Sequence, residues 1–200
     1  QEVPAHFSPK KFALTKGIQA ASGEIICTTD ADCVPPVTWV SALVAHFTGD
    51  TGFVAGFSPV HTIMSGDSDE TSIFPIRLFR SIYDRWMADF LLMDSIGLAV
   101  ASAGGISLGM PWTCAGRNLA YRKKVFEEVG GFEDVKHSVS GDDDLLMFLI
   151  HEKTNWKLRF AQEKSAAVPT YDDTDVRRIA HQRMRHSSKF FTHPFRVKIA

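Results

Sequence analysis

The sequence predicts an α/β fold, and three observations support this class. Short, mostly apolar segments rich in β-branched residues alternate with segments whose apolar residues recur at helical spacing. Hydrophobic residues make up 44% of the chain and charged residues 22%, a balance typical of a globular protein and not of a disordered tail, a collagen or a coiled coil. No internal repeat or low-complexity linker divides the 200 residues, so we treat 1–200 as one domain.

Four elements are expected in the first third of the chain. An amphipathic helix ends at Ser22–Gly23, because glycine favours the C-cap of a helix. Residues 24–29 are short, β-branched and mostly apolar, as in a buried strand. Pro35–Pro36 can begin the next helix, since proline fits the first helical turn. A second strand is expected over 53–57.

The rest of the chain continues the alternation. Large apolar residues about four apart predict a long helix over 73–93. Large and small residues alternate over 106–112, which predicts a strand. Residues 142–152 are expected to form a helix that begins with acidic side chains, where the helix dipole favours them. The remaining segments are a polar loop, a helix, a strand and a basic helix, at 61–71, 118–129, 157–161 and 176–189.

The charge distribution is uneven along the chain. The formal net charge is −1, which argues against a nucleic-acid binder. Residues 176–200 hold seven of the 22 Lys and Arg residues and none of the 23 acidic ones, which leaves 1–175 at −8. Three cysteines without a repeated spacing favour a reducing compartment over a disulfide framework or a zinc site. The uncharged window 95–116 contains five glycines, so we expect that it does not span a membrane, although it could touch a membrane surface.

The first candidate site is Asp30-Ala31-Asp32, at the end of the strand over 24–29. In open α/β sheets, ligands bind beyond the carboxyl ends of the strands. Two carboxylates one residue apart on a turn can share a divalent ion such as Mg²⁺ or Mn²⁺. The alternative is a plain turn in which Asp30 is a helix N-cap.

The second candidate site is Gly141-Asp142-Asp143-Asp144, before an apolar helix. A carboxylate held among others in this way is suited to act as a general base on a hydroxyl group. The alternative is an acidic first helical turn, favoured by the helix dipole alone.

The third candidate site is the segment from Gln182 to His186 on the predicted basic helix. Gln182, Arg185 and His186 would lie on one side of it, three and four residues apart. Arginine is suited to bind phosphate groups with two hydrogen bonds. The alternative is a solvated basic face or a helix on a membrane surface.

The fourth candidate site is Cys114-Ala115-Gly116-Arg117-Asn118. Glycine at the end of a strand permits close approach of the backbone to a ligand, although for a lone glycine a tight turn is the simpler interpretation. We interpret Cys114 as a small buried apolar residue and not as a nucleophile.

Together and in this order, these segments resemble the family 2 inverting glycosyltransferases of the GT-A fold. Residues 11–18 and 21–36 resemble the family's lysine segment and its DxD region, and the Gly141 segment its ED motif. Residues 116–122 with 129–132 resemble the segment on the acceptor side. The segment from Gln182 resembles the Q-x-x-R-W motif of the membrane-associated and processive branch, which includes cellulose synthase, hyaluronan synthase and ceramide glucosyltransferase. His186 stands where that motif has tryptophan.

The resemblance implies a Rossmann-like GT-A fold, with a mixed central sheet flanked by helices. The family's first strand-helix unit has no counterpart in these residues. We therefore expect 1–200 to be part of the catalytic domain of a longer enzyme and inactive alone, with 176–200 leading toward a membrane segment.

The resemblance also implies roles for individual residues. Asp32, helped by Asp30, would hold Mn²⁺ or Mg²⁺. Two alignments with the family's ED motif are possible. If Gly141 is aligned with the glycine of the motif, Asp143 takes the place of the catalytic base; if Asp144-Leu145 is aligned with the residues that follow the motif, Asp142 does. We favour Asp143. The expected diphosphate-binding residues are Gln182, Arg185, Arg183 and Lys11. The expected residues on the acceptor side are Gly116, Asn118, Asp144 and His186.

The implied activity is hexosyl transfer from a nucleotide-diphosphate sugar, a UDP-sugar, to a hydroxyl of a lipid or glycan acceptor with inversion. Glycolipid or polysaccharide synthesis at the cytoplasmic face of a membrane is the expected setting, without a nucleic-acid partner. The alternatives are a non-catalytic nucleotide-sugar-binding module and a membrane-surface interaction module. A nucleotidyltransferase could also use Asp-x-Asp, but it would not explain Gln182-x-x-Arg185.

Overall fold

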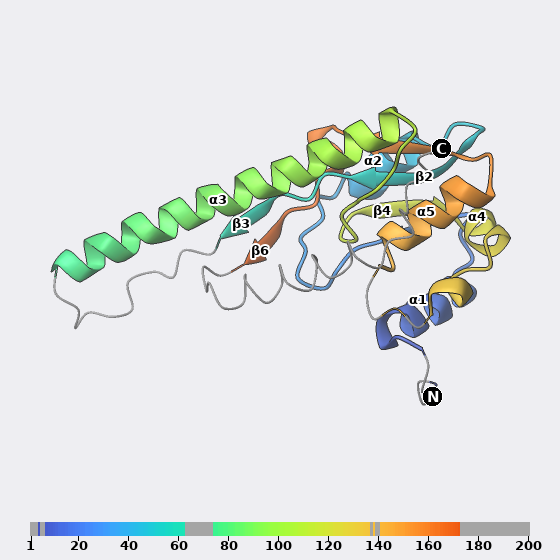
Figure 1. Cartoon of the computed structure of the whole chain (residues 1–200), viewed down its shortest axis with the longest axis horizontal. Helices are drawn as coiled ribbons and strands as arrows, with labels where there is room; N and C mark the ends of the chain where they lie inside the picture. The colour runs from blue at the N-terminus through green and yellow to red at the C-terminus, as the bar shows by residue number, and fades with distance from the viewer. Residues whose placement is uncertain (1–3, 5–6, 63–73, 137, 139–140, 173–200) are drawn as a thin grey trace, which may run out of the picture.

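The computed structural model describes residues 4, 7–62, 74–136, 138 and 141–172 (Figure 1). The predicted basic helix over 176–189 lies outside these residues, and so do Gln182, Arg183, Arg185 and His186. The helices and strands are, in order, α1 (Pro9–Ala20), β1 (Ile25–Thr28), α2 (Trp39–Ala45), β2 (Thr51–Gly56), β3 (Val60–Thr62), α3 (Phe74–Ser107), β4 (Leu119–Arg122), α4 (Lys123–Glu128), the 3-10 turn η1 (Glu133–Val135), α5 (Asp144–Lys153), β5 (Lys157–Ala161), the 3-10 turn η2 (Lys164–Ala166) and β6 (Thr170–Asp172).

A mixed four-stranded sheet forms the centre of the fold, in the order β1-β4-β2-β5. Strand β4 is antiparallel to both of its neighbours, and it aligns Tyr121 with Ile26 on one side and with Phe53 on the other. Strand β5 is parallel to β2. The predicted α/β class with a mixed sheet is therefore confirmed.

Helices cover both faces of this sheet, because side chains alternate along each strand. Phe53 and Tyr121 lie on the face covered by α1, α4 and α5, where the larger core cluster forms. Val54 and Ala120, one residue along, lie on the opposite face against Trp39 of α2. The expected elements at α1, β1, α2, β2, α5 and β5 are all present, with ends that differ by a few residues.

Helix α3 is much longer than the predicted helix over 73–93. It continues through Gly104 and Gly105 to Ser107 and ends where Gly109 takes a φ of 70°. The strand expected over 106–112 is therefore wrong. The alternation there extended over only a few residues, and the small residues before it are compatible with an unbroken helix.

Helix α3 packs against β3 and β5 and extends past the small parallel sheet of β3 and β6 (Figure 1). Its segment Ile82–Ser107 is long and apolar enough to cross a membrane, judged by length and composition. We expected no segment of this kind from the sequence. The difference arises because the apolar residues before Ser95 and the uncharged window after it belong to one helix.

Two other expectations differ from the structure. The helix expected over 118–129 is wrong in its first half, since residues 119–122 form the central strand β4 and only 123–128 are helical. Pairing with β1 and β2 on both sides outweighs the helical preference of these residues. In the expected loop over 61–71, His61 and Thr62 belong to β3, and the other residues lie outside the described part.

Candidate active site

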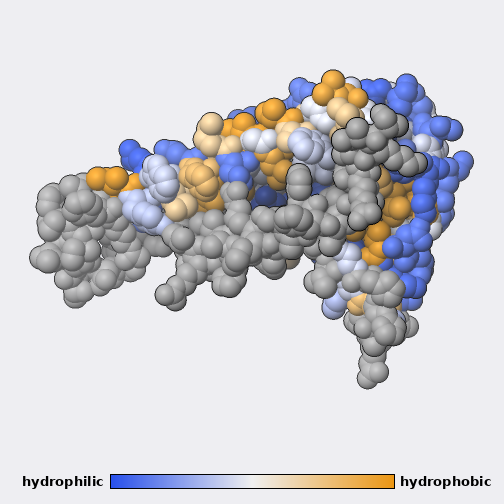
Figure 2. Space-filling model, in the orientation of Figure 1, coloured by the Kyte–Doolittle hydropathy of each residue, from blue (hydrophilic) through white to orange (hydrophobic). Residues whose placement is uncertain are grey.

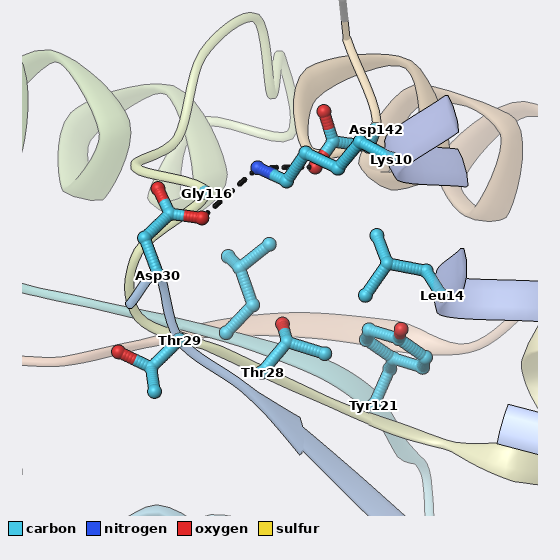
Figure 3. A pocket seen from close by; sticks show the side chains of 9 residues that line it. Lys10, Leu14, Thr28, Thr29, Asp30, Gly116, Tyr121 and Asp142 are labelled. Carbon is cyan, nitrogen blue, oxygen red and sulfur yellow. Dashed lines mark hydrogen bonds and ion pairs between the residues drawn. The ribbon is translucent and has the colours of Figure 1, made fainter. Parts of the chain in front are cut away.

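Four segments from both halves of the chain meet beyond the carboxyl end of β1. They are the first turn of α1, the residues after β1, the turn before β4 and the turn before α5 (Figure 3). A small open hollow lies between them. Its lining residues are Lys10, Leu14, Thr28, Thr29, Asp30, Gly116, Leu119, Tyr121 and Asp142.

Lys10 joins the two acidic motifs across this hollow. Its Nζ donates to Asp30 Oδ1 at 3.0 Å and lies 2.9 Å from Asp142 Oδ2 (Figure 3). Burial opposes the charge of this ammonium group, but the hydrogen bonds and charges of Asp142 and Asp30 outweigh it and raise the pKa of Lys10 above its usual value. Lys10 is therefore a permanent cation between two carboxylates that are 112 positions apart in the sequence.

Lys11, the lysine expected to bind diphosphate, does not line the hollow. It is fully buried, and its Nζ donates to the carbonyl oxygens of Val135 and Ser138 at 2.8 and 2.9 Å. Neighbouring residues on a helix point about 100° apart, so α1 can direct only one of the two lysines toward the hollow. The sequence alone does not show which of the two lysines faces the hollow, so Lys10 was not identified from the sequence. The position of Lys10 beside Lys11 was the one signal that could have indicated it.

Asp143 is buried at the start of α5 and is 7% exposed. Its Oδ1 accepts a hydrogen bond from the backbone N–H of Asp144 at 2.8 Å, so this side chain is the N-cap of the helix. A Cβ atom at Gly116 would lie only 2.7 Å from Asp143 Oδ2. The glycine therefore allows this carboxylate to approach the turn before β4, beside the hollow that Gly116 lines.

Asp144 and Asn118, both expected on the acceptor side, are hydrogen-bonded inside the protein and do not line the hollow. Asp144 Oδ1 accepts from the backbone N–H of Cys114 at 2.7 Å. The Asn118 amide donates to the carbonyl oxygens of Phe57 and Ala166, and it accepts from the indole N–H of Trp39 at 2.9 Å. Their positions fit structural roles, and Gly116 is the expected acceptor-side residue that lines the hollow.

The turn after β1 offers a partial set of metal ligands. Asp32 is exposed, while one oxygen of Asp30 is already bound by the Lys10 ammonium. Within the described part of the chain, no three His, Cys, Asp or Glu side chains are grouped as a metal site. Asp32 and Asp30 alone supply at most two carboxylate ligands, so a divalent ion such as Mg²⁺ would need phosphate oxygens and water to complete its coordination.

The floor of the hollow is apolar and rigid. Tyr121 stacks on Phe53 and Phe126, with ring centroids 6.2 and 5.9 Å apart, and Leu14 of α1 lies above it in Figure 3. Burial raises the pKa of the Tyr121 phenol well above its usual value, so the group stays protonated. The turns that hold Asp30 and Asp142 therefore lie next to a packed apolar core.

Comparison with known proteins adds one match. The model of the family described as Glycosyl transferase family 2 matches residues 10–107, which contain Lys10, Asp30 and Asp32 but end before Gly116 and Asp142. No curated protein matches the chain. At the level of the family, this match implies the GT-A fold and glycosyl transfer from a nucleotide-sugar donor to an acceptor. Residues 10–107 are thus similar to glycosyl transferase family 2.

Proposed function

We propose that this protein transfers a hexosyl group from a UDP-sugar to an acceptor hydroxyl with inversion, and that Asp143 is the catalytic base. The observation that carries the proposal is the meeting of the two acidic motifs at one hollow. Asp30 and Asp142 share the Lys10 ammonium there, and Asp143 lies beside the hollow, against the Gly116 that lines it.

The donor side of the proposed site is the turn after β1. The exposed carboxylate of Asp32 would hold Mn²⁺ or Mg²⁺ with help from Asp30, and a bound ion of this kind supplies Lewis-acid stabilisation to a diphosphate. Lys10 would contribute the second positive charge toward the diphosphate, in the role that the resemblance assigned to Lys11. Arg185, Gln182 and Arg183 are proposed to bind the diphosphate as well.

Asp143 fits the role of base better than Asp142 does. An oxygen of Asp142 is already engaged in an ion pair with Lys10, at 2.9 Å from the ammonium nitrogen. Asp143 would take the proton of the acceptor hydroxyl, whose oxygen forms the new bond to the anomeric carbon as the bond to the diphosphate breaks. A single displacement of this kind inverts the anomeric centre and needs no covalent enzyme intermediate.

The acceptor and the setting extend the proposal. We propose a lipid or glycan acceptor and a location at the cytoplasmic face of a membrane. The basic composition of 176–200 supports this, since clustered Lys and Arg residues are attracted to an anionic leaflet.

Substitutions of the two aspartates test the proposal in the complete enzyme. Asp143→Asn should abolish transfer while donor binding stays close to that of the wild type. Asp142→Asn should retain measurable transfer and weaken donor binding, because it releases Lys10. Asp134→Asn, at an exposed carboxylate that pairs with Lys153, is the control and should change neither. Near-normal transfer by Asp143→Asn would reject Asp143 as the base, and donor binding without any transfer by the wild type would indicate a non-catalytic binding module.

A further inference from the structure

The second half of α3 presents an apolar surface that the glycosyl-transfer site does not use. Met93, Ile96 and Val100 follow one another at spacings of three and four residues, so they lie on one side of the helix, and all three are exposed. Leu108, Met110 and Trp112 continue the exposed apolar residues into the turn that follows. We call these six residues the α3 apolar face; Figure 2 shows hydrophobic surface recurring along α3.

We propose that the α3 apolar face rests in the interfacial layer of a lipid bilayer, with α3 lying along the membrane surface. The first argument is composition. The segment Ile82–Ser107 has the mean hydropathy of a membrane-crossing helix, 1.5, yet only 22% of its most apolar window is buried inside the protein. A helix this apolar in the core of a globular protein is mostly buried, and this one is not.

The distribution of charge is the second argument. Residues 95–116 contain no Asp, Glu, Lys or Arg over 22 consecutive positions. The charged side chains of the helix, such as Arg85, Asp89 and Asp94, come before this stretch. A surface that binds a protein partner is usually bordered by a polar rim, whereas a stretch without charges can contact lipid without burying a charged side chain.

Trp112 provides the third argument. Its indole N–H donates to the carbonyl oxygen of Ala101 at 3.1 Å, and the ring packs at Gly105, where a Cβ would lie 2.6 Å from it. The polar group of the indole is therefore satisfied within the protein, while the side chain stays half exposed. Tryptophan is enriched at the membrane–water interface, where an amphipathic ring of this kind is stable.

The packing of α3 favours a helix that lies on the bilayer over one that crosses it. Met87 and Leu91 are buried with Val60 of β3, and Ser95 accepts a hydrogen bond from the backbone N–H of Val60 at 3.4 Å. A spanning helix would have to give up these contacts and expose β3. The α3 apolar face ends at Trp112, four residues before Gly116, which lines the hollow.

Vesicle flotation of the whole chain tests this proposal without measuring sugar transfer, so failure of the membrane contact and failure of the proposed transfer activity can be told apart. Vesicles of phosphatidylcholine alone and of phosphatidylcholine with phosphatidylserine should both carry the wild type. The double variant Met93→Glu, Val100→Glu should reduce the bound fraction by about tenfold or more, since each substitution places a charge where the bilayer would bury an apolar side chain. Both residues are exposed, so the fold should be retained.

The matched control is Val37→Glu, Val40→Glu. It adds the same charge at two exposed valines near α2, on the opposite face of the sheet, and it should float as the wild type does. A wild type that floats with neither vesicle overturns the proposal, and so does equal flotation of the two double variants. A stable dimer that dissociates in the Met93→Glu, Val100→Glu variant would also overturn it, because the face would then bind a second copy of the chain.

Discussion

Gly116→Ala tests whether the position of the Asp143 carboxylate limits catalysis. The new methyl carbon would lie 2.7 Å from Asp143 Oδ2 and 3.2 Å from its Cβ and Cγ atoms. No backbone strain is involved, since Gly116 is not among the glycines with positive φ. The substitution therefore acts on one contact.

The size of the effect follows from that contact. An ordinary contact begins at 3.4 Å, so Asp143 Oδ2 has to move from 2.7 Å to 3.4 Å, a shift of about 0.7 Å. A misplacement of about 1 Å at a catalytic group can reduce the rate by about a hundredfold, so we expect kcat to fall by roughly 10- to 100-fold. The same overpacking should lower the free energy of unfolding by about 1–3 kcal/mol.

The assay is steady-state transfer by the complete enzyme, with donor binding measured separately. The KM for the donor should change little, because Asp30 and Asp32 lie on a different segment from the displaced side chain. Gly17→Ala is the control, since a Cβ at Gly17 meets no atom within 4 Å. It replaces a glycine inside α1 and should raise stability by about 0.5–1 kcal/mol without changing kcat.

An unchanged kcat in Gly116→Ala, at a temperature where the variant is folded, would refute the reasoning. It would mean either that Asp143 does not act on the acceptor or that its position is not limiting. A loss of kcat that only tracks the loss of folded protein would refute it equally.

Three further predictions concern stability and are measured by urea unfolding. Asp144→Ala should lower the free energy of unfolding by about 1–3 kcal/mol, because the buried N–H of Cys114 loses its acceptor, while Asp144→Asn should lower it less. Asn118→Ala removes three hydrogen bonds, two of them buried, and should lower the free energy of unfolding by about 3 kcal/mol or more. Burial raises the pKa of Glu163, but backbone hydrogen bonds and His46 outweigh it and lower the pKa below its usual 4.5. The Glu163–His46 pair should contribute at most about 1 kcal/mol to the free energy of unfolding, because it is partly exposed. This contribution should be present above pH 4.5 and be lost as the pH falls through the lowered pKa. The difference in free energy of unfolding between the wild type and Glu163→Gln should therefore disappear in that pH range.

Each of these has a contradicting result. If Asp144→Ala and Asp144→Asn lower the free energy of unfolding by the same amount, the hydrogen-bond acceptor at this position does not account for the loss of stability. A loss below about 1 kcal/mol at Asn118 would show that the freed groups find other partners. A gap at Glu163 that widens in acid would reverse the sign of the pKa shift.

The sequence was most informative where a local pattern determines the structure. Strand β1 and helix α5 were predicted because apolar runs and helix-start signals are local, and both candidate acidic motifs fall at their ends. Residues 119–122 could not be read in this way. They are a strand because β1 and β2 pair with them from two sides, and neither pairing can be read from the four residues themselves.

The same limit applies within the site. Lys10 and Lys11 are identical in type and adjacent, so only the packing of α1 against the chain near Val135 decides which one reaches the acidic motifs. The contact between Gly116 and Asp143 joins positions 27 apart in the sequence. Neither the segment around Gly116 nor the segment around Asp143 indicates this contact by its own residues. The roles of Asp32, Asp143 and the segment from Gln182 stay predictions.

The position of β4 shows that the end of the family match and the end of the folded unit are different places in the chain. The family match ends at residue 107, but the strand that joins β1 to β2 comes later in the chain, at 119–122. Without it, β1 and β2 would face each other across an empty place in the sheet, each with unpaired backbone groups. A shortened protein should therefore retain the chain at least through β5, and a cut made where the match ends would divide the sheet at its centre.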